Sequence, residues 1–107
     1  MSEENKTPMS EETYKAGRAA FYNAYLTKIN ELKKEFVTSN NPYKEGDIIE
    51  DHIGKGLWNG NYHIYTRDSD SLPEMVYHCR VLKKDGTPTK KEEYRGIYGS
   101  NILIKKQ

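Results

Sequence analysis

The chain has few of the residues that bind metals, act in catalysis or cross-link a small fold. It holds a single cysteine, Cys79, among 107 residues, which excludes an intramolecular disulfide framework. Its three histidines and Cys79 also lack the close spacing of a zinc motif. No apolar stretch approaches the roughly 20 residues that span a bilayer. We therefore expect no metal site, no cofactor and no contact with a membrane.

Catalytic signatures are missing as well. The sequence contains neither the Ser-x-x-Lys nor the Gly-x-Ser-x-Gly pattern. The segment Gly54-Lys55-Gly56 is not a phosphate loop, because no helical pattern follows it. We expect a protein that is not an enzyme. The first residues lack the basic and apolar regions of a signal peptide, so a cytoplasmic location is the expectation.

One break of pattern organises the chain. At Ser39-Asn40-Asn41-Pro42, apolar spacings of three and four give way to short runs rich in Ile, Val and Tyr. Residues 1–9 are expected to form a flexible acidic tail, and residues 10–39 a long helix with Ser10 as its N-cap. Pro42 prevents the helix from continuing. Residues 43–107 then form a second region, so the fold class is α+β.

The predicted helix carries an apolar stripe at spacings of 3, 4, 3 and 4: Tyr22, Tyr25, Ile29, Leu32 and Phe36. A helix of this length, about 42 Å at 1.5 Å per residue, is longer than a barrel of some 65 residues. Part of the stripe then overhangs unless the helix breaks or another chain covers it. Packing of Tyr25, Ile29, Leu32 and Phe36 on the barrel is one expectation. The other is a homo-oligomer, assembled through a surface of Ala20, Phe21, Ala24 and Tyr25.

The second region reads as five short strands. Alternation and turn residues place them at Asp47–Ile53, Leu57–Thr66, Met75–Lys84, Tyr94–Tyr98 and Ile102–Lys105. In the third strand, Met75, Tyr77, Cys79 and Val81 fall on one face and His78 and Arg80 on the other, which makes Cys79 a small buried apolar residue. Asp85-Gly86 is a strong signal for a tight turn, and Pro88 indicates that the next strand starts later.

Two segments resemble SH3 domains. Tyr43-Lys44-Glu45-Gly46-Asp47-Ile48-Ile49-Glu50 is similar to a Gly-Asp turn that precedes an apolar strand, and Gly99-Ser100-Asn101-Ile102-Leu103 is similar to the Ser-Asn turn before the last strand. The resemblance covers residues 43–107 and implies a five-stranded antiparallel SH3-like barrel. The paired Trp of the polyproline groove is absent, so only the barrel geometry is carried over. The short, Lys- and Tyr-rich chain is also similar in style to phage and mobile-element products.

A basic surface is the other candidate site. Residues 75–107 hold eight basic and three acidic residues, whereas residues 39–74 hold three basic and seven acidic ones. Bases and aromatic residues surround the expected hairpin 78–95, a combination that holds single-stranded nucleic acid in small barrels. The candidate residues for nucleic acid or a small anion are His78, Arg80, Lys83, Lys84, Tyr94 and Arg95. Asp85, Glu92 and Glu93 lie among them and weaken the local positive field.

Together these patterns favour a small non-enzymatic interaction module. We expect it to bind a protein partner through a Tyr-rich barrel face, since nine tyrosines offer contact area at low entropic cost. Self-association through the helix is part of the same expectation. The alternatives are single-stranded nucleic-acid binding through residues 78–95, and a phage-type inhibitor that blocks a host factor or sequesters a small anionic ligand.

Overall fold

A long helix precedes the sheet, as predicted. The computed structural model describes residues 7–104, in which α1 runs from Glu11 to Ser39. Ser10 caps it: the Ser10 hydroxyl oxygen accepts a hydrogen bond from the amide of Thr13 at 3.1 Å. Glu11 and Glu12 occupy the first turn, where the positive end of the helix dipole favours acids.

Side chains satisfy the carbonyl groups at the end of the helix. The Asn40 amide donates to the carbonyl of Phe36 at 2.8 Å, and the hydroxyl of Thr38 donates to that of Lys34 at 2.7 Å. Asn41 holds the segment that follows the helix. Its side-chain oxygen accepts hydrogen bonds from the amide of Tyr43 at 3.0 Å and from the hydroxyl of Tyr77 at 2.8 Å. A core tyrosine therefore fixes the chain where it leaves α1.

Two units make up the chain, and the boundary between them falls between Leu32 and Lys33. The first consists of helix as far as Leu32, and the second of the last turns of α1 with all the strands. Val37 is the one buried residue of α1, all of whose residues are described. The expectation that Tyr25, Ile29, Leu32 and Phe36 pack on the barrel is not met at Tyr25 and Leu32, which are 59% and 63% exposed, whereas Ile29 is partly buried and Phe36 is 38% exposed.

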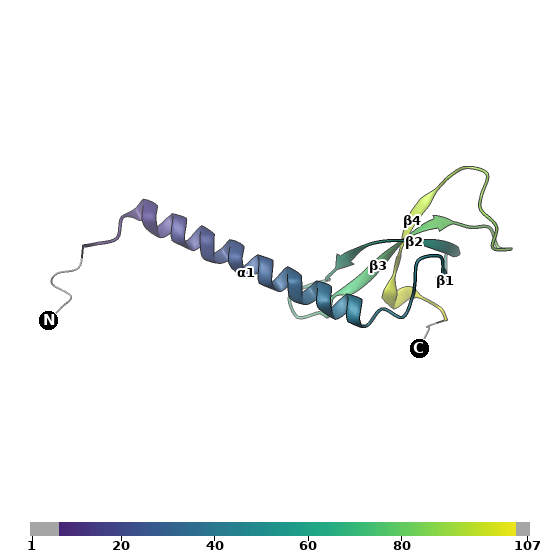
Figure 1. Ribbon diagram of the computed structural model, residues 1–107, viewed down its shortest axis with the longest axis horizontal. Coiled ribbons are helices and arrows are strands. Elements are labelled where there is room, and N and C mark those ends of the chain that lie inside the picture. The colour runs from purple at the N-terminus through teal and green to yellow at the C-terminus, as the bar shows by residue number, and fades with distance from the viewer. Residues whose placement is uncertain (1–6, 105–107) are drawn as a thin grey trace. The chain divides into compact units, whose positions relative to one another are not determined.

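The second unit is built on four antiparallel strands in the order β1-β2-β3-β4 (Figure 1). They are β1 (Ile48–Glu50), β2 (Lys55–Tyr65), β3 (Glu74–Val81) and β4 (Tyr94–Tyr98). The sheet curls into half a barrel. The register of β2 and β3 shifts between Trp58 and Tyr62, where Gly60 has a φ of 91° that only glycine adopts readily. This bulge bends the longest strand and adds to the curl.

The predicted fifth strand does not form within the described residues. Gly99–Asn101 form a short 3-10 helix, η2, and Ile102 to Ile104 belong to no strand; Lys105 lies outside the described residues. One ladder-like bond remains: the amide of Leu103 donates to the carbonyl of Glu50 in β1 at 2.9 Å. The segment after η2 therefore returns to the free edge of the sheet without extending it.

The core lies inside the curl. It consists of Val37, Ile49, Trp58, Met75, Tyr77, Cys79, Ile97 and Ile102. Cys79 is fully buried, and this burial raises the pKa of its thiol to about 12. Gly56 packs directly against it, since a Cβ there would lie 2.5 Å from that of Cys79. The inner-face assignment is thus confirmed for Met75, Tyr77 and Cys79, whereas Val81 at the end of β3 is only partly buried.

Candidate functional site

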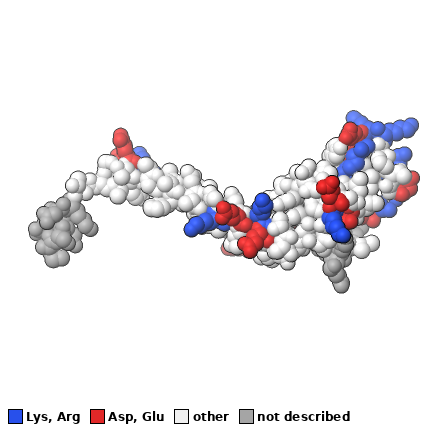
Figure 2. All heavy atoms as spheres, viewed as in Figure 1, with Lys and Arg blue, Asp and Glu red and all other residues white. Residues whose placement is uncertain are grey.

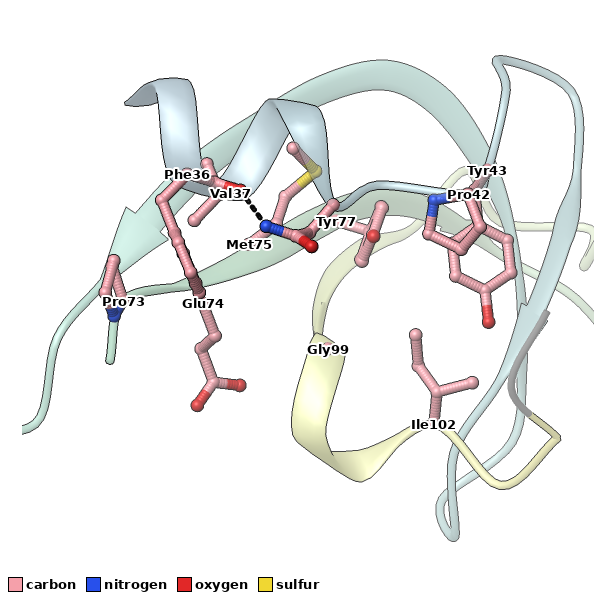
Figure 3. Close-up of a pocket in the computed structure, with 11 residues that line it drawn as sticks. Phe36, Val37, Pro42, Tyr43, Pro73, Glu74, Met75, Tyr77, Gly99 and Ile102 are labelled. Carbon is pink, nitrogen blue, oxygen red and sulfur yellow. Dashed lines mark hydrogen bonds between the residues drawn. The ribbon is translucent and has the colours of Figure 1, made fainter. Parts of the chain in front are cut away.

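An apolar groove opens beside the core of the second unit (Figure 3). Phe36, Pro73 and Glu74 lie on one side of it and Pro42 and Tyr43 on the opposite side. The remaining lining residues are Val37, Asn40, Met75, Tyr77, Gly99 and Ile102. Its volume is about 240 Å³, below the roughly 300–1,000 Å³ of small-molecule sites. The groove is therefore suited to a protein side chain rather than to a cofactor.

Aromatic rings that pack edge to face form the floor of the groove. The Tyr77 ring meets Tyr43 edge to face at 5.4 Å and Trp58 at 5.0 Å between ring centroids. Burial, with a smaller contribution from Tyr43, raises the pKa of the Tyr77 hydroxyl to about 12. That hydroxyl stays protonated and donates to Asn41, so the floor offers a ligand mainly apolar surface.

One charge stands at the rim. Glu74 is the single ionisable acid or base, apart from tyrosine, among the residues that line the groove. Its Oε1 accepts hydrogen bonds from the hydroxyl and the amide of Ser100, at 2.8 and 3.1 Å. These bonds orient the carboxylate and hold η2 against β3. An apolar side chain next to a basic one matches this combination of groove and rim.

The structure divides the predicted basic surface between two faces of the sheet. His78 and Arg80 lie opposite Gly96 and Tyr94, so His78, Arg80 and Tyr94 share the outer face. Arg95 lies opposite Cys79 and shares the inner face. The sequence alone did not show this, because the register between β4 and β3 decides which residues of β4 face inward.

Arg95 is also neutralised. Its guanidinium binds the carboxylate of Asp51 through two hydrogen bonds, of 2.9 and 2.5 Å, and Asp51 is only 4% exposed. The amides of Ile53 and Gly54 bind the same carboxylate. The bond from Arg95 is the main reason that the pKa of Asp51 falls to about 2. This ion pair closes the β1–β2 turn and leaves Arg95 little capacity for a phosphate.

The other basic residues of the set are scattered. Arg80 donates to the carbonyl of Thr89 at 3.1 Å, and Tyr94 donates to the carboxylate of Glu92. Lys83 and Lys84 are exposed at the turn predicted from Asp85-Gly86, where Gly86 has a φ of 88°. Figure 2 shows acidic side chains beside the basic ones over this end of the sheet. The geometry therefore favours the groove over the basic hairpin.

The predicted assembly residues, Ala20, Phe21, Ala24 and Tyr25, all lie exposed on α1 within the first unit. Phe21 is 79% exposed, and Tyr25, one helical turn later, is 59% exposed on the same face. Tyr14 and Leu32 extend this apolar face in both directions, at 57% and 63% exposure. We call these four large side chains, Tyr14, Phe21, Tyr25 and Leu32, the helix stripe.

Sequence reasoning missed the groove, the Asp51–Arg95 pair and a contact between His63 and His78. Each joins residues far apart in the chain, and the sequence predicted only that His78 faces outward. Within residues 7–104 there is no cluster of three or more metal-ligating side chains, and no helix there is long and apolar enough to cross a membrane.

No family model matches this chain, and neither does any curated protein or solved structure.

Proposed function

We propose that the protein is a small non-enzymatic interaction module that self-associates through α1 and binds a protein partner in the groove. The observation that carries the proposal is the helix stripe. Helices in water gain most of their stability from packing an apolar face, and none of residues 7–32, the described part of the first unit, is buried. Large exposed apolar side chains on one face of a helix, here interrupted by Arg18 and Lys28, are typical of an interaction site.

A second copy of the chain is the occupant that fits the stripe. Acidic and basic side chains are mixed along α1, which holds five basic and four acidic residues, so two copies can pair without strong charge repulsion. An antiparallel pair also opposes the two helix dipoles favourably. The small side chains Ala20 and Ala24 flank Phe21 and allow a close approach.

Replacing Phe21 by Glu tests self-association. The wild-type chain is expected to show the mass of a dimer or larger assembly in light scattering, and Phe21→Glu that of a single chain. The reason is that the substitution places a charge in the middle of the helix stripe, which the proposed dimer buries. Asn30→Glu is the matched control, because nine residues at 3.6 per turn put position 30 on the opposite side of the helix. A wild-type chain that stays monomeric at high micromolar concentration contradicts the proposal.

The groove is the proposed partner site, and an SH3-like completion of the half-barrel is part of this proposal. The bond from Leu103 to Glu50 supports it, because this bond brings the last described segment to the edge where a fifth strand would pair. The partner segment we propose presents an apolar side chain to Met75 and Tyr77 and a basic one to Glu74.

Selection of short peptides on the full chain tests the groove. Peptides that combine apolar and basic residues are expected to be enriched on the wild type and to lose binding to Phe36→Lys, which puts a cation on the apolar rim. Ile53→Lys carries the same kind of change at an exposed apolar residue outside both the groove and the helix stripe, and is expected to retain them. If no peptides are enriched, or if Phe36→Lys binds them equally well, the groove is not the partner site.

A further inference from the structure

Two histidines meet on the outer face of the sheet. His63 Nδ1 lies 2.7 Å from His78 Nε2, and their ring centroids are 4.9 Å apart. Neither residue lines the groove, and neither takes part in the helix stripe. The pair therefore has no place in the proposed function.

The strands account for this contact. His63 in β2 lies opposite Val76 in β3, and His78 follows two residues later, so both side chains project from one face as diagonal neighbours. Gly96 lies opposite His78 in β4 and supplies no side chain to cover it. A shallow hollow of about 400 Å³ remains over the pair, lined also by Asn59, Tyr94, Gly96 and Arg95, whose charge is paired with Asp51.

We propose that His63 and His78 bind one divalent transition-metal ion of the Zn²⁺, Ni²⁺ and Cu²⁺ class. Neutral imidazole nitrogen is a preferred ligand of these ions. Two nitrogens at 2.0–2.1 Å from a tetrahedral Zn²⁺ are about 3.3 Å apart, so the pair has to open by only about 0.6 Å. His63 is exposed and His78 is partly so, and small side-chain rotations provide this opening.

The residues around the two histidines also determine how the metal ion would be coordinated. The described residues supply no third His, Cys, Asp or Glu there, so the remaining coordination positions belong to water or to a ligand from outside the chain. Mg²⁺ and Ca²⁺ prefer oxygen ligands and are not expected to compete. Because β3 points Tyr77 inward and His78 outward, metal binding is independent of the groove.

Calorimetric titration of the untagged full chain with Zn²⁺ tests the site. The wild type is expected to bind one ion per chain saturably. His63→Ala and His78→Ala are each expected to lose that binding, because a single imidazole is left. His52→Ala is the matched control, since it removes an exposed histidine from outside the pair, and it is expected to bind as the wild type does.

Imidazole resonances in NMR spectra provide the second readout. Substoichiometric Zn²⁺ is expected to shift the signals of His63 and His78 and to leave those of His52 unchanged. An excess of Mg²⁺ is expected to shift none of them. The absence of saturable Zn²⁺ binding by the wild type, or equal binding by both Ala variants, would show that the pair is only a hydrogen bond and overturn the proposal.

Discussion

Arg95→Ala is expected to lower the free energy of unfolding by about 3–5 kcal/mol, the usual cost of removing one partner from a buried ion pair. The reason is that the variant keeps the Asp51 carboxylate, 4% exposed, without its cation. Urea unfolding followed by far-UV circular dichroism measures the loss. The double variant Arg95→Ala, Asp51→Asn removes the uncompensated charge and is expected to recover part of it. Equal stability of Arg95→Ala and the wild type would contradict a structural ion pair.

The pH dependence of the free energy of unfolding tests the same ion pair. The pKa of Asp51 is about 2 in the folded chain against 3.8 for the free side chain. A lowered folded-state pKa stabilises the protein above pH 3.8, and this stabilisation is lost as the pH falls towards 2. The difference corresponds to about 2 kcal/mol. Arg95→Ala is expected to flatten this acid-dependent part of the stability curve.

Trp58→Ala is expected to cost about 3–5 kcal/mol, as buried large-to-small aromatic changes do. Trp58 is 6% exposed, packs edge to face on Tyr77, and donates from its indole nitrogen to the carbonyl of Asn61 at 2.6 Å. The side chain therefore supports the core and also bridges the bulge of β2. The midpoint of thermal unfolding, monitored by circular dichroism, reports the change.

Trp58→Phe tests how much of this cost a smaller ring recovers. It keeps a six-membered ring near Tyr77 but loses part of the indole volume and the hydrogen bond, whose acceptor residue Asn61 is exposed to water. A cost of about 1–3 kcal/mol is expected, below that of Trp58→Ala, because the ring fills part of the cavity and water replaces the lost donor. If Trp58→Phe is as unstable as Trp58→Ala, packing of a ring against Tyr77 contributes little.

Local patterns predicted most of the secondary structure. The apolar spacing, the Ser10 cap and Pro42 correctly indicated one helix ending at about Ser39, because each acts within a few residues. Alternation correctly placed Tyr77 and Cys79 inside. The same logic failed at Ile102 to Ile104, where an apolar run resembles a strand but follows a 3-10 turn and makes a single ladder bond.

Prediction of the site was poorer because the site depends on register. Arg95 was grouped with Arg80 by charge and proximity in sequence, whereas one position of register sends the two side chains to opposite faces. His78 was predicted to face outward, yet nothing local shows that β2 brings His63 next to it. The apolar spacing of α1 likewise predicts a helix without predicting what covers it.

The bond between Leu103 and Glu50 bears on how the protein is made. These residues are 53 positions apart in sequence, so on a ribosome β1 is synthesised long before its late partner emerges. Until then the Glu50 carbonyl at this edge lacks its partner, and an unpaired strand edge attracts strands from other nascent chains. A contact of such long range also forms more slowly than a hairpin. We therefore expect aggregation during synthesis to be greatest before residue 103 emerges from the ribosome.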